Sequence, residues 1–143
     1  MGTRDDGQSL QNWSTLILEA MQTAEKLEDF QQNWRPTREK VDLAVKTAVE
    51  VARPSRVFVF GSWARGDAKA DSDLDLAVFV DDDRVGEIGD LRKKIRSGLI
   101  GLKMSVDLVV ATEGYVQEFL SSINSVYYQI VNEGKLVYDA EHR

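Results

Sequence analysis

The sequence predicts an α/β (α+β) domain in which helices flank a small mixed β-sheet, and three observations lead to this prediction. Two amphipathic helical segments come before any run that resembles a strand. Short apolar runs and helical segments then alternate to the end of the chain. The stretch between the first two strand-like runs is too short for a crossover helix, so the sheet is not expected to be purely parallel. The 143 residues are enough for one compact core.

The first predicted helix runs from Ser9 to about Trp34, with Ser9 as its N-cap. Apolar side chains recur along it at intervals of three and four, as on one face of a helix. They are Leu10, Trp13, Ile17, Ala20, Met21, Ala24, Leu27 and Phe30. We therefore expect residues 1–35 to be a helical extension of a domain that spans residues 36–143, the whole forming a single compact unit.

Pro36 interrupts the helical pattern and favours the first turn of a second helix, which we expect to end at about Ala52, before Pro54. Two short runs of β-branched and aromatic residues follow, and both are typical of buried strands. The first covers Arg56–Phe60 and the second covers about Asp73–Val80. The stripe of the second helix consists of Val41, Ala44, Val45, Ala48, Val49 and Ala52.

The remaining chain predicts one more long helix, a third strand, two short helices and a final strand. The helix is expected over about Asp83–Ser97, with Gly98 as its C-terminal stop. The third strand is expected at Lys103–Val110, the short helices at about residues 112–132, and an edge strand at Lys135–Tyr138. The stripe of the long helix consists of Val85, Ile88, Leu91 and Ile95.

Composition excludes several classes of chemistry. The chain has no cysteine, so thiolate catalysis and cysteine-ligated zinc are impossible. Its one histidine, His142, lies next to the C-terminal residue, which argues against Ser–His catalysis. A net charge of −6 makes broad binding to nucleic acid backbones an unfavourable hypothesis. No apolar leader or membrane-spanning run is present, so we expect a cytoplasmic protein without a membrane partner.

Three carboxylates in strand-like runs predict a cation site. Asp73 and Asp75 begin the second strand and point to the same face, roughly 6.5 Å apart. Like charges at that spacing need a positive partner, and an all-oxygen site suits Mg²⁺. Asp107 interrupts the apolar third strand and can join the pair if the two strands are neighbours. Three carboxylates would then suit two Mg²⁺ ions.

Simpler interpretations exist for each feature alone. Two Asp residues at a strand start also fit a turn, and one Asp within a strand also fits a salt-bridged core residue. Their occurrence together in one small domain favours the cation site. The run that begins at Asp71 also imitates an EF-hand loop, but Leu76 occupies the position that requires glycine, so we reject that interpretation.

Gly61 and Ser62 directly follow the first strand and predict a phosphate-binding turn. Glycine lets the backbone approach a ligand closely, and amides at a helical turn over Ser62–Gly66 favour phosphate oxygens. Arg65 could contact the same phosphates. Gly61 and Gly66 have the glycine spacing of a P-loop, but the Lys and Ser/Thr that should follow are absent, so a P-loop is not expected.

These residues carry a family resemblance. The spacing of Gly61-Ser62, ten residues, and Asp73-Leu74-Asp75 resembles the signature of the DNA polymerase β-like nucleotidyltransferase superfamily. More narrowly, the segments GSWARG, SDLDL, VDLVV and NEGKLVYD are similar to those of the minimal nucleotidyltransferases, the MNT proteins. The similarity covers about Lys40–Asp139 and implies a nucleotidyltransferase fold. The predicted helix from Ser9 to Trp34 is an addition by which this chain differs from the simplest members of the family.

The resemblance also implies roles for the site residues. Gly61 and Ser62 would hold the triphosphate of ATP, while Arg65 is a further candidate for that contact. Asp73 and Asp75 would bind two Mg²⁺ ions, and Asp107 would complete the metal site and serve as the base. The implied reaction is transfer of AMP from ATP to a hydroxyl acceptor. For proteins of this kind, often antitoxins of HEPN/MNT toxin–antitoxin pairs, the acceptor is a tyrosine of the HEPN toxin.

Two other functions remain open at this stage. The chain could be a non-catalytic antitoxin that neutralises its partner by contact alone, with the Ser9–Trp34 helix as its docking face, although that helix could equally cover the core. It could also be a nucleotidyltransferase for a small molecule of the aminoglycoside type, with a second subunit completing the pocket. The sequence leaves the acceptor, the base preference and homo-oligomer formation undecided.

Overall fold

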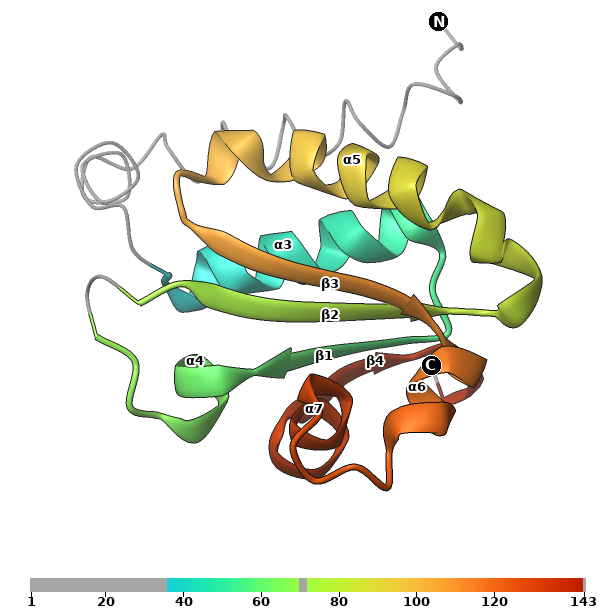
Figure 1. Ribbon diagram of the computed structural model, residues 1–143. Helices are drawn as coiled ribbons and strands as arrows, with labels where there is room; N and C mark the ends of the chain where they lie inside the picture. The colour runs from blue at the N-terminus through green and yellow to red at the C-terminus, as the bar shows by residue number, and fades with distance from the viewer. Residues whose placement is uncertain (1–35, 70–71, 143) are drawn as a thin grey trace, which may run out of the picture.

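The computed structural model describes residues 36–69 and 72–142 (Figure 1). The predicted helix from Ser9 to Trp34 and the extension over residues 1–35 therefore lie outside the described residues. The described elements, in chain order, are α3 (Arg38–Ala52), β1 (Arg56–Phe60), α4 (Gly61–Arg65), β2 (Leu74–Val80), the 3-10 helix η2 (Asp82–Glu87), α5 (Ile88–Leu99), the 3-10 turn η3 (Ile100–Leu102), β3 (Val106–Thr112), α6 (Glu113–Phe119), α7 (Val126–Glu133), β4 (Lys135–Asp139) and the 3-10 turn η4 (Ala140–His142).

The four strands form one mixed sheet, as the sequence predicts. Their order is β3-β2-β1-β4, so β3 and β4 are the edge strands. β1 is antiparallel to both β2 and β4, whereas β2 and β3 are parallel. The parallel pair is joined by the long connection that contains α5, as parallel neighbours require. The expected α+β class and the mixed sheet are thus confirmed.

Helices cover both faces of the sheet. α3 and α5 lie on one face, and α6 and α7 lie on the other (Figure 1). Alternate residues of β2 therefore enter two separate cores: Leu76 and Val78 pack on the α3–α5 side, while Ala77 and Phe79 pack on the α6–α7 side. Burial on both faces explains why the strands read as continuous apolar runs. No helix in the described part of the chain is long and apolar enough to cross a membrane.

The first described helix begins slightly later than expected and buries a lysine. Thr37 caps α3, since its hydroxyl oxygen accepts the Lys40 backbone N–H at 3.2 Å, and Pro36 precedes the cap. The Lys40 side chain is fully buried, and its ammonium donates to the Lys103 carbonyl at 3.0 Å. The apolar stripe predicted for this helix did not include Lys40. The hydrogen bond fixes the start of α3 against the loop that leads into β3.

The connection from β2 to β3 differs from the prediction in three ways. Residues Asp82–Glu87 form a 3-10 helix, and α5 begins at Ile88, so Val85 is 66% exposed and does not belong to the apolar stripe. The third strand begins at Val106 instead of Lys103, because Lys103 has a left-handed backbone, with φ of 53°, that ends η3.

The third difference concerns Gly98, which does not stop the helix. α5 continues to Leu99. A Cβ added at Gly98 would lie 2.7 Å from Thr47 Cγ2 on α3, which is closer than two carbon atoms can pack. Thr47 has little freedom to turn aside, since its hydroxyl donates to the Leu43 carbonyl at 2.8 Å. Gly98 is thus required for the close approach of α3 and α5, and its position within the helix was not evident from the sequence.

We expect Gly98→Ala to lower the free energy of unfolding by about 1–3 kcal/mol, in spite of the higher helix propensity of alanine, because the new methyl group overpacks the α3–α5 contact. Gly89→Ala is the matched control in the same helix. No atom lies within 4 Å of a Cβ added at Gly89, so this change should stabilise the protein by up to about 1 kcal/mol.

Thermal and denaturant unfolding of the two variants would check this expectation. Adding Thr47→Ser, which removes Cγ2 but keeps the hydroxyl, should restore the stability of the Gly98→Ala variant. Equal stabilisation by both alanine substitutions would contradict the packing role assigned to Gly98.

Candidate functional site

The predicted carboxylates gather at one end of the sheet, where β1 ends and β2 and β3 begin. Asp75 of β2 and Asp107 of β3 are direct partners in the parallel register. Because side chains alternate along each strand, both carboxylates lie on the α6–α7 face of the sheet, with Ala77 and Phe79 further along it. On its other side, Asp75 is the partner of Phe60, the last residue of β1. The expectation that the second and third strands are neighbours is confirmed.

The environment of Asp75 opposes its ionisation. Burial raises the pKa of Asp75, and the negative charges of Asp107 and Asp73 raise it further. A hydrogen bond with the Asp107 carboxyl acts in the same direction, while the positive charge of Arg65 opposes the shift. Asp73 lies just before β2 and is exposed. The fold therefore brings three like charges near one another and leaves Asp75 the least solvated of those predicted to bind metal.

Gly61 lies directly against the Asp75 carboxyl group. Its φ is +72°, in the left-handed region that favours glycine. A Cβ added here would be 2.9 Å from Asp75 Cγ and would overlap Oδ2. Both the backbone conformation and the close approach therefore require glycine at this position. The Gly-Ser turn predicts a phosphate-binding role for Gly61. The contact of Gly61 with Asp75 does not follow from that turn, because the two residues lie on different elements.

The residues after Gly61 form the short helix α4, in agreement with the predicted helical turn. The side chain of the N-cap residue, Phe60, makes no capping hydrogen bond. The Ser62 carbonyl accepts the backbone N–H groups of Gly66 and Asp67, each at 3.0 Å, and Gly66 closes the turn with φ of +85°. Gly61 and Ser62 are partly exposed at the start of α4, beside Asp75. Their phosphate-binding role stays a prediction.

Arg65 has a partner that the sequence interpretation did not assign. Its Nε lies 3.3 Å from Asp67 Oδ2, and both side chains are more than half exposed. An exposed pair of this kind contributes little to stability, and its geometry is easily exchanged for another. Asp67 follows Arg65 by two positions in the chain, and this spacing is the signal from which the pair could have been predicted. The effect of Arg65 on the pKa of Asp75 indicates that its charge acts on the carboxylate cluster.

The carboxylates supply the oxygen ligands that Mg²⁺ prefers. Their mutual repulsion at Asp75 is the electrostatic condition that a bound cation would relieve. Within residues 36–69 and 72–142, however, no three acidic, histidine or cysteine side chains are already arranged as a metal-binding cluster. The chemistry of the donors fits a divalent cation, while the described arrangement is a pair, Asp75 and Asp107, with Asp73 nearby.

The comparison with protein families agrees with this interpretation. The family model described as polymerase beta, nucleotidyltransferase, matches residues 44–143, a range that contains all six predicted site residues. No curated protein matches the chain. A crystal structure described as that of a candidate nucleotidyltransferase from Sulfolobus solfataricus is similar at 18% identity and a TM-score of 0.49, covering 99% of this chain and 95% of that one. At that level it carries no conclusion about activity. The family match alone is sufficient: the chain belongs to the polymerase β nucleotidyltransferase family.

Proposed function

We propose that this protein is an MNT-type adenylyltransferase that transfers AMP from ATP to a tyrosine hydroxyl of a HEPN-family partner protein. The observation that carries the proposal is the in-register pairing of Asp75 with Asp107, next to Gly61. It places two carboxylates beside the backbone of the Gly-Ser turn, which is the arrangement that a nucleotidyl-transfer site needs. The family match supports a nucleoside triphosphate as substrate, and divalent metal usually accompanies it.

Each site residue has a proposed role. The backbone at Gly61 and Ser62, with the Ser62 hydroxyl, binds phosphate oxygens, and Arg65 leaves Asp67 to contact them. Asp75 and Asp107 hold the first metal position, and Asp73, whose exposed side chain is not fixed by packing, turns toward them to complete the site. Two bound Mg²⁺ ions would neutralise the triphosphate and polarise the α-phosphate.

The reaction is an in-line displacement. The acceptor oxygen forms a bond to the α-phosphorus as the bond to the bridging oxygen of pyrophosphate breaks. Asp107 accepts the proton of the acceptor hydroxyl, and pyrophosphate leaves with the electron pair of the broken bond. Positioning supplies much of the rate, because the turn at Gly61 and the carboxylates hold the phosphates in one orientation relative to the acceptor. The choice of tyrosine in a HEPN protein rests on the resemblance to MNT proteins.

Radiolabelled ATP tests the reaction directly. With Mg²⁺ and a HEPN-family protein encoded beside this chain, label at the α-phosphate should become covalently attached to the partner, and label at the γ-phosphate should not. Asp73→Ala and Asp107→Ala should each reduce the transfer at least about 100-fold, since catalytic carboxylates and metal ligands commonly contribute that much. Attachment of γ-label, or full transfer by Asp73→Ala, would rule out the proposal.

Two glycine substitutions distinguish the effect of displacing Asp75 from the effect of backbone strain, and Gly61→Ala is the first of them. The substitution should abolish transfer, because the new Cβ displaces the Asp75 carboxyl group. Gly66→Ala is its control: Gly66 also has positive φ, but nothing lies within 4 Å of an added Cβ. Both variants should lose about 1 kcal/mol or more of stability, and only Gly61→Ala should lose activity. Equal loss of transfer in both would contradict the assigned contact.

Asp75→Asn should stabilise the metal-free protein at pH 7. The raised pKa of Asp75 means that the folded state binds this proton more tightly than the unfolded state does, so the wild type loses stability as pH rises through the folded-state pKa. The asparagine variant does not ionise and escapes this loss. Its higher Tm should therefore converge with that of the wild type as the pH falls below the ordinary range of aspartate. Mg²⁺ with ATP should raise the Tm of the wild type and leave the variant unchanged. A lower Tm for the variant at pH 7 would show that the charge is not destabilising.

A further inference from the structure

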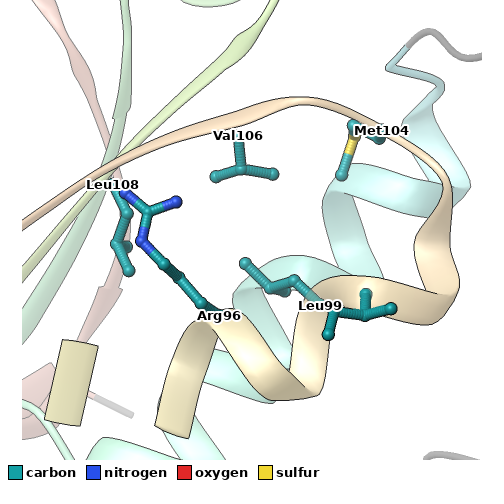
Figure 2. Close-up of a pocket in the computed structure, with 6 residues that line it drawn as sticks. Arg96, Leu99, Met104, Val106 and Leu108 are labelled. Carbon is teal, nitrogen blue, oxygen red and sulfur yellow. The ribbon is translucent and has the colours of Figure 1, made fainter. Parts of the chain in front are cut away.

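A second feature of the domain is a groove lined mainly by apolar side chains. A groove of about 270 Å³ lies between α5 and the edge strand β3, and it is lined by Arg96, Leu99, Ile100, Met104, Val106 and Leu108. Figure 2 shows Arg96 extending from α5 toward Leu108, with Leu99 of the same helix below Val106 and Met104. Ile100 is 74% exposed at its rim. The volume is below the roughly 300–1,000 Å³ of pockets for small organic ligands, so a few side chains fit it better.

The helix that borders the groove, with the turn that follows it, is basic. Between residues 91 and 103 the chain carries Arg92, Lys93, Lys94, Arg96 and Lys103, and no acidic residue. Within the described residues, Arg96 takes part in no salt bridge or side-chain hydrogen bond. A complementary occupant would therefore combine an apolar face with negative charge.

The N-terminal segment of this chain has both properties. Residues 9–34 carry the apolar stripe predicted above, with Glu19, Glu25, Glu28 and Asp29 against a single Lys26. As a helix, the 26 positions would extend on the order of 39 Å, more than the roughly 18 Å of α5. Its length therefore does not prevent it from running along the whole of α5.

The residues that follow the segment lie close to the groove. It leads into Pro36, which is buried, and then into the cap of α3. The hydrogen bond from Lys40 to the Lys103 carbonyl holds the start of α3 beside Met104, which lines the groove. The segment therefore needs no long connection to reach it.

From these observations we infer that residues 9–34 dock in cis on the groove between α5 and β3, with their acidic residues toward the basic side chains of α5. Val106 and Leu108 flank Asp107 on β3, so the segment would pack against the opposite face of the strand that carries this carboxylate. Docking would cover the edge of the sheet and hold that strand in place. The inference does not depend on the proposed transfer reaction.

The absence of cysteine makes the full-length chain suitable for a site-directed spin-label test. Ser97→Cys places a nitroxide at an exposed position of α5, next in the chain to Arg96, which lines the groove. Ser121→Cys is the matched control, because Ser121 is exposed in the loop between α6 and α7, on the other side of the sheet. We expect the amide signals of residues 10–30 in ¹⁵N-labelled protein to lose most of their intensity with the label at position 97 and to keep it with the label at position 121.

Two further samples determine which molecule occupies the groove. Adding Ile100→Asp to the Ser97→Cys protein should restore the signals, and it should leave the domain folded because Ile100 is largely exposed. Mixing spin-labelled ¹⁴N protein with unlabelled ¹⁵N protein should cause no loss. Loss of signal intensity in the mixed sample would show that the segment of a second copy occupies the groove. Equal signal intensity with the label at position 97 and at position 121 would show that the segment does not lie at the groove. Either result overturns the inference.

Discussion

The parallel, in-register pairing of β2 with β3 is the constraint on which the rest of the structure depends. It sets Asp75 beside Asp107, and it requires the long crossover through α5 because parallel neighbours cannot be joined by a tight turn. That crossover in turn needs Gly98 for α5 to approach α3 closely. The carboxylates and the helical layer on the other face of the sheet are therefore two results of the same strand arrangement.

The site is assembled at the expense of local stability. Asp75 is partly desolvated between like charges, and Gly61 holds a left-handed backbone against it. Neither feature improves the packing of the domain: the charge of Asp75 opposes folding, and the backbone at position 61 requires glycine. Conflicts of this kind between local preference and the surrounding fold are common at functional sites. They support the assignment of this end of the sheet as the place where the family's chemistry occurs.

The two faces of β3 carry side chains that contribute to different features of the domain. One face presents Asp107 to the site, while Val106 and Leu108 on the other face line the groove beside α5. β3 is also an edge strand, so it is paired through β2 alone within the described sheet. A strand that is paired on one side only supports its side chains less firmly than a central strand, and this strand carries the carboxylate for which we propose a catalytic role. A segment docked in the groove, as we infer for residues 9–34, would add support from the opposite face of the strand and would link these residues to the site.

The sequence by itself determined the class of fold and the mixed sheet, and it predicted that Asp75 and Asp107 lie near one another. These features could be predicted because short apolar runs, and a carboxylate inside such a run, are local signals. It could not determine where the third strand begins, since the left-handed backbone of Lys103 depends on the preceding turn. It also misplaced Val85, because residues Asp82–Glu87 form a 3-10 helix before α5 begins. Gly98 was misplaced because its role depends on how closely α3 approaches α5. Only the tertiary structure decided that Gly61 lies against Asp75. That contact joins residues distant in the chain, and such contacts follow from strand register and helix packing rather than from any local pattern.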